Sequence, residues 1–472
     1  MEIIYHSHID REIESLIERI HPPRVCIDND CCRDSTVVKI DSANRHGVLL
    51  EMVQVLTDLD LLISKSYICS DGGWLMDVFH VTDQVGNKLT DKSLVHYIQQ
   101  TLCEARSGKE ISSDIELQTC KGPSSSAVNL AIEVTATDRP GLFSEISAVL
   151  LGLGFDVVST TAWTHNDKAA CVIHLEDASI NDAERLAHVQ VQLENVVGAH
   201  GGNAERARRV NLRSFGAGRN HTERRLHQLM YADGDYESCR TCHGDKSEEH
   251  KKGCDGTHVS VGRYEEKGYW AVNVRSRDRP KLLFDTVCVL TDLHYEVFHA
   301  AVSSTSSIAD QEYFVKPMSG SNLDNEIERR KLTLCLIAAV ERRVSHGLKV
   351  DIRTQNRRGL LSKMTRVIRE NGLSIARVEL GVEGEIAVGS LYVTDCSGQD
   401  VNPNIAALLR SETGGSIVAS YSSPYRTPIP LSSSRTMHEA KSSTGFRPTF
   451  SLGSMLWSQL ERLSNNFGSI RS

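Results

Sequence analysis

The chain has 472 residues, of which 40% are hydrophobic and 24% are charged, so it can bury real cores and is not a wholly disordered polymer. At the usual size of a domain, this length predicts about three to four domains. The 53 lysines and arginines are outnumbered by 61 acidic residues, a net charge of −8, so we do not expect the chain to bind nucleic acid.

Thirteen cysteines, an odd number scattered through apolar stretches, predict free thiols in a reducing compartment. The acidic N-terminus does not resemble a targeting peptide, and no apolar run approaches the ~20 residues that a membrane-spanning helix needs. We therefore predict a cytoplasmic location, with the nucleus as an additional compartment, and no membrane partner. Residues 1–34 are expected to form an N-terminal helical segment.

One pattern occurs four times along the chain: a short alternating strand, then Asn/Asp-Arg-x-Gly, then an amphipathic helix. The four junctions are Asn44–Gly47, Asp138–Gly141, Asp278–Lys281 and Asn356–Gly359, with lysine in place of glycine in the third. Asn or Asp before a helix can cap free backbone N–H groups, and glycine permits a tight turn or a close approach.

Two strand-like runs and a second helix follow each junction, so the order is β-α-β-β-α-β, the ferredoxin-like pattern. The predicted strand pairs are Leu62–Ser70 and Trp74–Thr82, Phe155–Trp163 and Ala169–Leu175, Tyr295–Ser303 and Gln311–Lys316, and Ser374–Leu380 and Ile386–Thr394. The predicted second helices include Lys92–Glu104, Ala183–Val197 and Asn325–Arg342. We predict an α+β fold with four tandem copies: copy 1 (35–120), copy 2 (127–215), copy 3 (257–345) and copy 4 (347–422).

Copy 3 is irregular, because its second helix runs almost directly into Leu348–Thr354, the predicted first strand of copy 4. Copy 3 therefore lacks a last strand of its own. The runs Thr257–Arg263 and Trp270–Arg275 read as a hairpin, so we predict that the upstream run takes the place of that strand.

Residues 216–256 between copies 2 and 3 are predicted to be a polar linker with one short helix, Thr222–Tyr231. The linker carries Cys239, Cys242, His243 and Cys254, residue types that can hold zinc. Because the paired spacing of a zinc site is incomplete, we predict free thiols and no metal, with a structural zinc site as the alternative.

A basic stretch runs from the end of copy 2 into this linker: Arg206, Arg208, Arg209, Arg213, Arg219, Arg224 and Arg225. No aromatic residues alternate with these arginines as in a platform for single-stranded nucleic acid. We interpret the stretch as a solvated strand face and linker.

The tail, residues 423–472, is rich in Ser, Thr and Pro and is predicted to be disordered over most of its length. Its end places Leu452, Leu456, Leu460 and Leu463 on one face of a terminal amphipathic helix. We expect this helix to dock on the chain's own domains or on a partner protein.

Catalytic signatures are absent from the sequence: no Gly-x-x-x-x-Gly-Lys-Ser/Thr phosphate loop, no Gly-x-Ser-x-Gly elbow, no His-Glu-x-x-His zinc motif and no His-Asp dipeptide. We therefore predict a protein that is not an enzyme and that has no cofactor.

The junctions resemble those of the ACT domain, a ferredoxin-like regulatory module that binds amino acids in metabolic enzymes. Over nearly its full length the chain is similar to the plant ACT domain repeat (ACR) family, whose members carry four such domains and no enzyme domain. The stretches Ser70–Phe79, Thr222–Ala232, Asp278–Asp285 and Leu456–Leu463 carry this similarity further. The family in turn resembles the regulatory C-terminus of bacterial uridylyltransferases that sense glutamine.

The resemblance implies an amino-acid ligand at the first strand–helix loop, where two ACT domains commonly pack together. A helix N-terminus, with its unpaired N–H groups, suits a ligand carboxylate. The residues implied are Asn44, Gly47, Val48, Asp138, Gly141, Leu142, Asn356, Gly359 and Leu360, and more weakly Asp278 and Lys281.

The resemblance thus implies a regulatory protein that senses an amino acid or nitrogen status and signals to a protein partner, through its ACT surfaces or its C-terminal helix. The alternative is an interaction scaffold whose ACT domains bind no ligand, and a remote alternative is a uridylyltransferase-like enzyme. Pairing of domains within one chain or between chains, as in a homo-oligomer, stays open.

Overall fold

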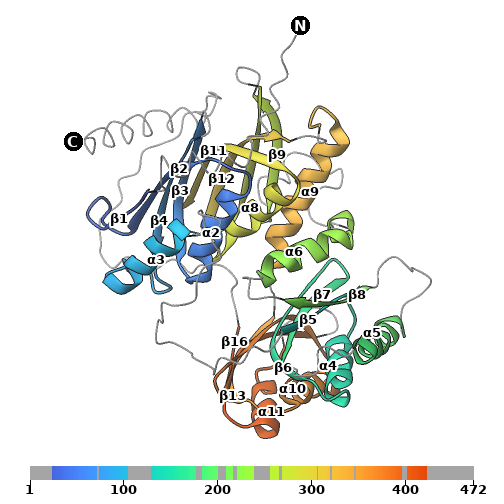
Figure 1. Cartoon of the computed structure of the whole chain (residues 1–472). Helices are drawn as coiled ribbons and strands as arrows, with labels where there is room; N and C mark the ends of the chain where they lie inside the picture. The colour runs from blue at the N-terminus through green and yellow to red at the C-terminus, as the bar shows by residue number, and fades with distance from the viewer. Residues whose placement is uncertain are drawn as a thin grey trace, which may run out of the picture.

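The computed structural model describes residues 24–71, 74–104, 129–176, 183–199, 209–215, 221–238, 256–264, 268–305, 307–318, 322–344, 347–395 and 401–421. Two antiparallel sheets, each with a layer of helices, form an upper and a lower half of the molecule (Figure 1). The predicted α+β fold of four ferredoxin-like copies is confirmed. Within the described ranges, no helix is long and apolar enough to span a membrane.

Copies 1 and 3 together form the upper, eight-stranded sheet A, in the order β1-β2-β4-β3-β11-β12-β10-β9. Its strands are β1 (Arg24–Asp28), β2 (Thr36–Ala43), β3 (Leu62–Asp71), β4 (Trp74–Thr82), β9 (His258–Tyr264), β10 (Tyr269–Arg277), β11 (Tyr295–Thr305) and β12 (Ile308–Pro317).

Copies 2 and 4 form the lower, eight-stranded sheet B, in the order β16-β13-β15-β14-β6-β7-β5-β8. Its strands are β5 (Asn129–Thr137), β6 (Asp156–His165), β7 (Lys168–Glu176), β8 (Arg209–Phe215), β13 (Leu348–Gln355), β14 (Leu373–Glu383), β15 (Ile386–Asp395) and β16 (Ser416–Tyr421).

The two copies of each sheet meet along the same strand of the repeat, the one that follows the first helix. In sheet A, β3 pairs antiparallel with β11, with Tyr67 opposite Ala301. In sheet B, β6 pairs antiparallel with β14, with Thr161 opposite Glu379. The copies are therefore paired within the chain, 1 with 3 and 2 with 4, although neither pair is adjacent in the sequence.

Strands β1 and β9 form the two edges of sheet A and complete copies 1 and 3. β9 pairs with β10, Val261 opposite Val272, at the position that β8 and β16 hold in copies 2 and 4, which confirms the prediction for copy 3. The predicted helical segment 1–34 is wrong over residues 24–28, which form β1 and take the same position in copy 1. A strand from upstream thus replaces the last strand in both copies of sheet A.

Helices cover one face of each sheet, because their apolar stripes pack with the inward strand residues into one core per sheet. The helices of sheet A are α2 (Val48–Asp58), α3 (Lys92–Glu104), α8 (Leu282–Asp292) and α9 (Glu326–Arg342). Those of sheet B are α4 (Leu142–Gly152), α5 (Ala183–Gly198), α10 (Leu360–Glu370) and α11 (Ile405–Thr413).

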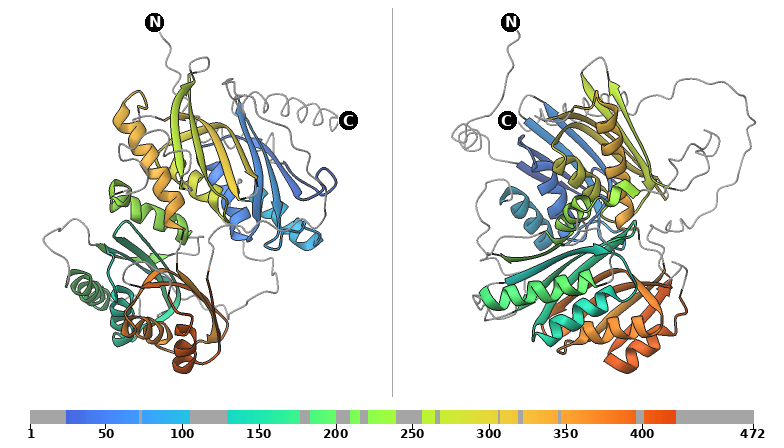
Figure 2. Two further views of the ribbon diagram at one scale, coloured as in Figure 1. Left: turned by 180° about the vertical axis from the view of Figure 1, so that it is seen from behind. Right: turned by 90° about the vertical axis from the view of Figure 1, so that its right-hand side faces the viewer.

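Part of the predicted linker, residues 216–256, packs between the two halves of the molecule. Helix α6 (Thr222–Ala232) and the short 3-10 helix η1 (Asp235–Ser238) lie between the two halves, as Figure 2 shows for α6 in two further views. On one side Leu226, Leu229 and Met230 bury themselves with Trp163 against the face of sheet B that carries no other described helix. On its other side α6 packs against α8. The helix predicted over Thr222–Tyr231 is confirmed, and the tertiary structure makes it the contact between the halves.

Candidate functional site

All four junctions have the same backbone geometry at the start of a helix. Gly47, Gly141 and Gly359 have φ values of 85°, 83° and 78°, the left-handed region that glycine adopts at little cost. Lys281 holds the same conformation at φ 63° without being glycine. None of the four helices that follow has a side-chain cap, so their first N–H groups are not satisfied by a capping side chain.

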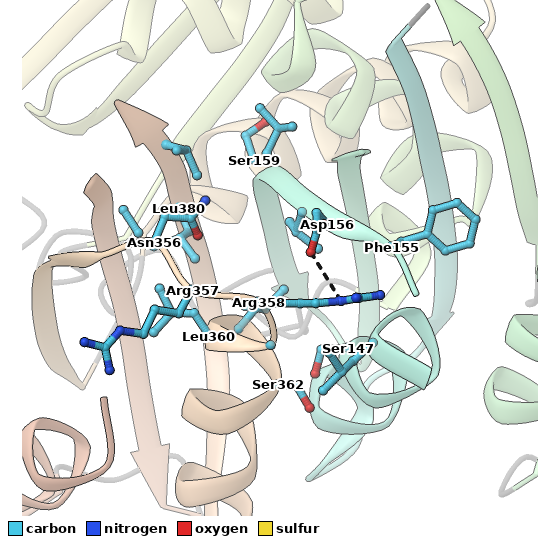
Figure 3. Close-up of a pocket in the computed structure, with 17 residues that line it drawn as sticks. Ser147, Phe155, Asp156, Ser159, Asn356, Arg357, Arg358, Leu360, Ser362 and Leu380 are labelled. Carbon is cyan, nitrogen blue, oxygen red and sulfur yellow. Dashed lines mark ion pairs between the residues drawn. The ribbon is translucent and has the colours of Figure 1, made fainter. Parts of the chain in front are cut away.

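The copy 4 junction lines a cavity of about 310 Å³ between copies 4 and 2. Asn356, Gly359 and Leu360, three of the predicted site residues, lie on its copy 4 side (Figure 3). Copy 2 contributes the end of α4 and the start of β6, including Leu151 and Asp156. The cavity therefore exists because two copies pair along β6 and β14.

Opposite charges face each other at this cavity. Arg358 Nε lies 3.6 Å from Asp156 Oδ1, the ion pair drawn dashed in Figure 3, and both side chains are more than half exposed. The geometry of a helix start leaves the N–H groups of Leu361 and Ser362 without an intrahelical acceptor. The side chain of Asn356 makes no hydrogen bond within the described part of the chain and stays available to a ligand.

A position that the sequence analysis missed distinguishes the copy 4 junction from the other three. In the other copies the junction arginine pairs with an acid four residues after the glycine position: Arg45 with Glu51 (2.5 Å), Arg139 with Glu145 (2.5 Å) and Arg279 with Asp285 (2.7 Å). In copy 4 that position is Lys363, which is exposed, so Arg357 is not drawn onto its own helix and lines the cavity instead. An alignment of the four junctions that extended four residues beyond the glycine position would have revealed this difference.

The equivalent position in sheet A, between copies 3 and 1, is nearly closed, with a cavity of about 20 Å³. Asp278 is buried there, and Lys281 Nζ donates to Glu223 Oε1 of α6 at 2.8 Å. The charge of Lys281 thus binds another part of the chain, and the weaker prediction of a ligand contact at Asp278 and Lys281 gains no support from this geometry.

The copy 2 junction is covered by copy 4. An added Cβ at Gly141 would lie 2.9 Å from Cδ of Arg369, whose side chain lies over the glycine. Burial, together with the neighbouring Asp167, raises the pKa of Asp138 to about 6, although the Arg139 backbone N–H opposes the shift. Leu142 is buried in the core, so its side chain faces away from any ligand.

The copy 1 junction is tied to copy 3 by its own side chains. Asn44 Nδ2 donates to Ser70 Oγ at 2.7 Å and to Glu296 Oε1 of copy 3 at 3.3 Å. An added Cβ at Gly47 would meet nothing within 4 Å, and Val48 is buried in the core. The predicted residues of copies 1, 2 and 4 therefore occupy three separate places, and only those of copy 4 line the larger cavity.

A network of buried charges links α6 and η1 to copy 3. Asp285 is fully buried and accepts hydrogen bonds from Arg343 Nη2 at 2.6 Å and pairs with His227 Nε2 at 2.8 Å. Burial alone would raise the pKa of Asp285, but Arg343 and Arg279 hold it well below its usual value. Arg342 makes a second buried pair with Asp235 of η1 at 2.5 Å.

Two arginines of the predicted solvated basic stretch belong to this contact, so that interpretation is wrong for them. Arg224 pairs with Asp292 of α8 at 2.7 Å, and Arg225 pairs with Glu133 of β5 at 2.5 Å. Both arginines are partly buried.

The predicted alternative zinc residues Cys239, Cys242, His243 and Cys254 lie outside the described residues, as does the predicted terminal helix with Leu452, Leu456, Leu460 and Leu463. Among the described residues, no group of His, Cys, Asp and Glu side chains has the arrangement of a metal site.

Comparison with known proteins adds independent findings. A family model described as the ACR family N-terminal ACT domain matches residues 31–109. The ACT domain-containing protein ACR1 of Arabidopsis thaliana is 48% identical over 485 residues, covering 100% of both chains. ACR2 of the same plant is 39% identical and covers 99% of each chain. These names describe domain content and no catalytic activity.

A shorter similarity connects the chain to an enzyme. The bifunctional uridylyltransferase/uridylyl-removing enzyme of Azospirillum brasilense is 37% identical over 84 residues. That match covers 18% of this chain and 9% of the enzyme, so it does not extend to most of the enzyme's length.

Proposed function

The chain belongs to the plant ACT domain repeat family, and from that premise we propose that it is a non-catalytic regulatory protein that binds an amino acid and signals to a partner protein. The observation that carries this proposal is the cavity of about 310 Å³ between copies 2 and 4. Its volume is at the lower end of the range of small-molecule sites, which suits a ligand as small as one amino acid.

The chemistry at the cavity matches the two charges of an amino acid. The ligand carboxylate lies at the N-terminus of α10, where the N–H groups of Leu361 and Ser362 and the Arg358 guanidinium donate to it. The ammonium group lies against Asp156, whose pairing with Arg358 shows that the two groups reach the same space. Asn356 completes the polar end of the site.

Signalling follows from the place of the cavity in the fold. The strands that line it, β6 and β14, extend to the contact between the halves, where Trp163 of β6 packs edge-on against His227 at 4.9 Å between ring centroids. On β14, Arg377 Nη1 donates to the Arg343 carbonyl oxygen at 2.9 Å. A ligand that tightens β6 against β14 therefore acts on α6 and on the surfaces of both halves, which a partner can read. We also propose a cytoplasmic location, with the nucleus as an additional compartment.

The test is a thermal-shift titration of the full chain with a panel of the proteinogenic amino acids. A ligand that binds the folded state raises Tm progressively with its concentration. The variant Arg358→Gln should weaken binding about tenfold or more, because a charge-assisted hydrogen bond to the carboxylate is lost.

A matched control is Arg263→Gln, since Arg263 is 59% exposed in an ion pair with Asp324, as Arg358 is 58% exposed in its pair with Asp156. This variant should keep full affinity. A flat response to every amino acid would contradict the proposal and favour the scaffold that binds no ligand. Equal loss in both variants would place the ligand elsewhere.

A further inference from the structure

Resting on the proposed function, we infer that the cavity between copies 2 and 4 selects an amino acid with a neutral aliphatic side chain, and that the chain binds one such ligand. If Asp156 and Arg358 bind the charged groups of the ligand, its side chain must lie in the rest of the cavity.

Apolar side chains form much of the wall of the cavity. Six of these side chains come from α4 and three strands: Leu151, Val157, Val158, Leu380, Val382 and Ala387. Val382 and Ala387 are register partners on β14 and β15, so the pairing of these strands builds one continuous apolar surface. A charged ligand side chain would lose its hydration against this surface without gaining a partner.

Two of the polar residues that line the cavity, Ser147 and Arg357, already have partners within the chain. Ser147 Oγ lies 2.9 Å from Thr365 Oγ1 and donates to the Ser144 carbonyl oxygen at 3.0 Å, both in the buried contact between α4 and α10. Arg357 extends away from Asp156 in Figure 3, and its Nη2 donates to Gln355 Oε1 at 3.3 Å. The ion pair of Asp156 and Arg358 at the cavity suits the ammonium and carboxylate groups that every amino acid shares.

A single ligand per chain follows from the other junctions. The equivalent cavity in sheet A has about 20 Å³, too little for an amino acid. At the copy 2 junction the charged side chain of Arg369 lies against Gly141, where the copy 4 junction has the apolar Leu151 against Gly359. At the copy 1 junction Asn44 bridges to Glu296. The paired copies therefore share the same backbone arrangement, but the side chains at their junctions differ.

The experiment is isothermal titration of the full chain with leucine, isoleucine and valine against glutamine, glutamate and lysine. Aliphatic ligands should bind at least about tenfold more tightly than the charged and amide ligands, with a stoichiometry of one. Val158→Asp should weaken leucine binding about tenfold or more without unfolding the chain, because Val158 is already 36% exposed. Val418→Asp, at a 56% exposed position of the same sheet, is the control and should bind leucine normally.

A second comparison tests the polar end. In Asp156→Asn the affinity for leucine should fall about tenfold, whereas the affinity for 4-methylpentanoate, which lacks the ammonium group, should not change. Equal losses for both ligands would overturn the assignment of the ammonium group to Asp156.

The outcomes separate this inference from the proposed function. If glutamine or glutamate binds most tightly and Arg358→Gln still weakens it, the proposed function stands and the aliphatic selectivity is wrong. If two or more ligands bind per chain, the single-site inference is wrong. If no amino acid of either panel binds, both fail together.

Discussion

Sheets A and B are built from the same parts in the same order, yet they use the same junction differently. In sheet A the copy 3 junction is closed to about 20 Å³, and its Lys281 and Asp285 bind Glu223 of α6 and Arg343 just after α9. In sheet B the copy 4 junction has Gly359 and Lys363 at these positions and leaves about 310 Å³ open. In sheet A the charged side chains at the copy 3 junction bind other parts of the chain. In sheet B those at the copy 4 junction remain available to a ligand.

The outer faces of the sheets differ in a related way. α6 covers part of sheet B with Leu226, Leu229 and Met230, and the same helix reaches the α8 layer of sheet A through Arg224 and His227. A helix that is polar on one face and apolar on the other therefore joins two dissimilar surfaces. The repeat therefore sets the backbone arrangement of each sheet, while a few charged positions determine whether a junction binds another part of the chain or lines a cavity.

The largest expected effect is at Asp285, which distinguishes the two sheets most sharply. Asp285→Asn should lower the free energy of unfolding by about 3–5 kcal/mol, because Arg279 and Arg343 would remain buried without their counter-charge. Urea titration followed by circular dichroism measures this loss. Asp310→Asn, at an exposed ion pair with Arg275, is the control and should cost less than about 1 kcal/mol. A loss at Asp285 as small as that of the control would contradict the cohesive role of the junction.

The next effect is pH-dependent and concerns the link from α6 to sheet A. Burial raises the pKa of Glu223, but Arg343 and Lys281 outweigh it and lower the pKa to about 2. A folded pKa below the unfolded value of 4.5 means stability that is present above pH 4.5 and lost as the pH falls toward 2. Glu223→Gln should therefore be less stable than the natural chain by about 2–3 kcal/mol at pH 7, with the difference shrinking below pH 4.5.

Urea titrations from pH 7 to pH 3 measure this difference. The control is Glu370→Gln, since Glu370 is exposed beside Arg366 and should show little pH-dependent change. A Glu223→Gln difference that stays constant down to pH 3 would argue against the paired carboxylate.

A smaller effect compares two junction glycines, Gly47 with free space around its Cα and Gly359 with a side chain of the paired copy close by. Gly47→Ala and Gly359→Ala share the cost of a side chain in the left-handed region, about 1–2 kcal/mol. An added Cβ at Gly359 also lies 3.0 Å from Cδ2 of Leu151, whereas one at Gly47 meets nothing within 4 Å. Gly359→Ala should therefore cost about 1 kcal/mol more than Gly47→Ala in thermal unfolding. Equal costs would mean that copy 2 yields to the new methyl group.

The smallest effect is expected for Lys281→Gly, which gives copy 3 the glycine of the other copies. The variant relieves a left-handed lysine and loses the pair with Glu223, so stability should change by no more than about 1 kcal/mol. Ligand stoichiometry by isothermal titration should remain at one, because Thr57 and Phe284 still line the closed cavity. A second binding equivalent would show that Lys281 alone closes the site in sheet A.

Local sequence patterns were sufficient for most of the elements and for the turn at each junction. The predicted helix Lys92–Glu104 and strand Trp74–Thr82 coincide with α3 and β4, because their apolar periods are set by residues a few positions apart. The prediction for β9 succeeded because the short distance between α9 and β13 leaves no room for another strand. β1 was missed, since a five-residue edge strand with little burial carries a weak pattern.

The candidate site was predicted only in part. Asn356, Gly359 and Leu360 were identified from their junction, but Asp156, Val158 and Val382 were not, because they lie on other strands and reach the cavity only through the pairing of β6 with β14. The apolar character of those strands is also what any core strand would show, so nothing local marks them as ligand-facing.

The sequence by itself determined four copies of one frame, the turn at each junction and the lack of known catalytic motifs, because these depend on short-range patterns. The tertiary structure alone decided that copy 1 pairs with copy 3 and copy 2 with copy 4, that α6 is buried between the halves, and that the copy 4 junction lines a cavity of about 310 Å³. The physical reason is that edge pairing and charge burial depend on which surfaces meet, and four copies with similar edges allow several pairings that no local pattern distinguishes.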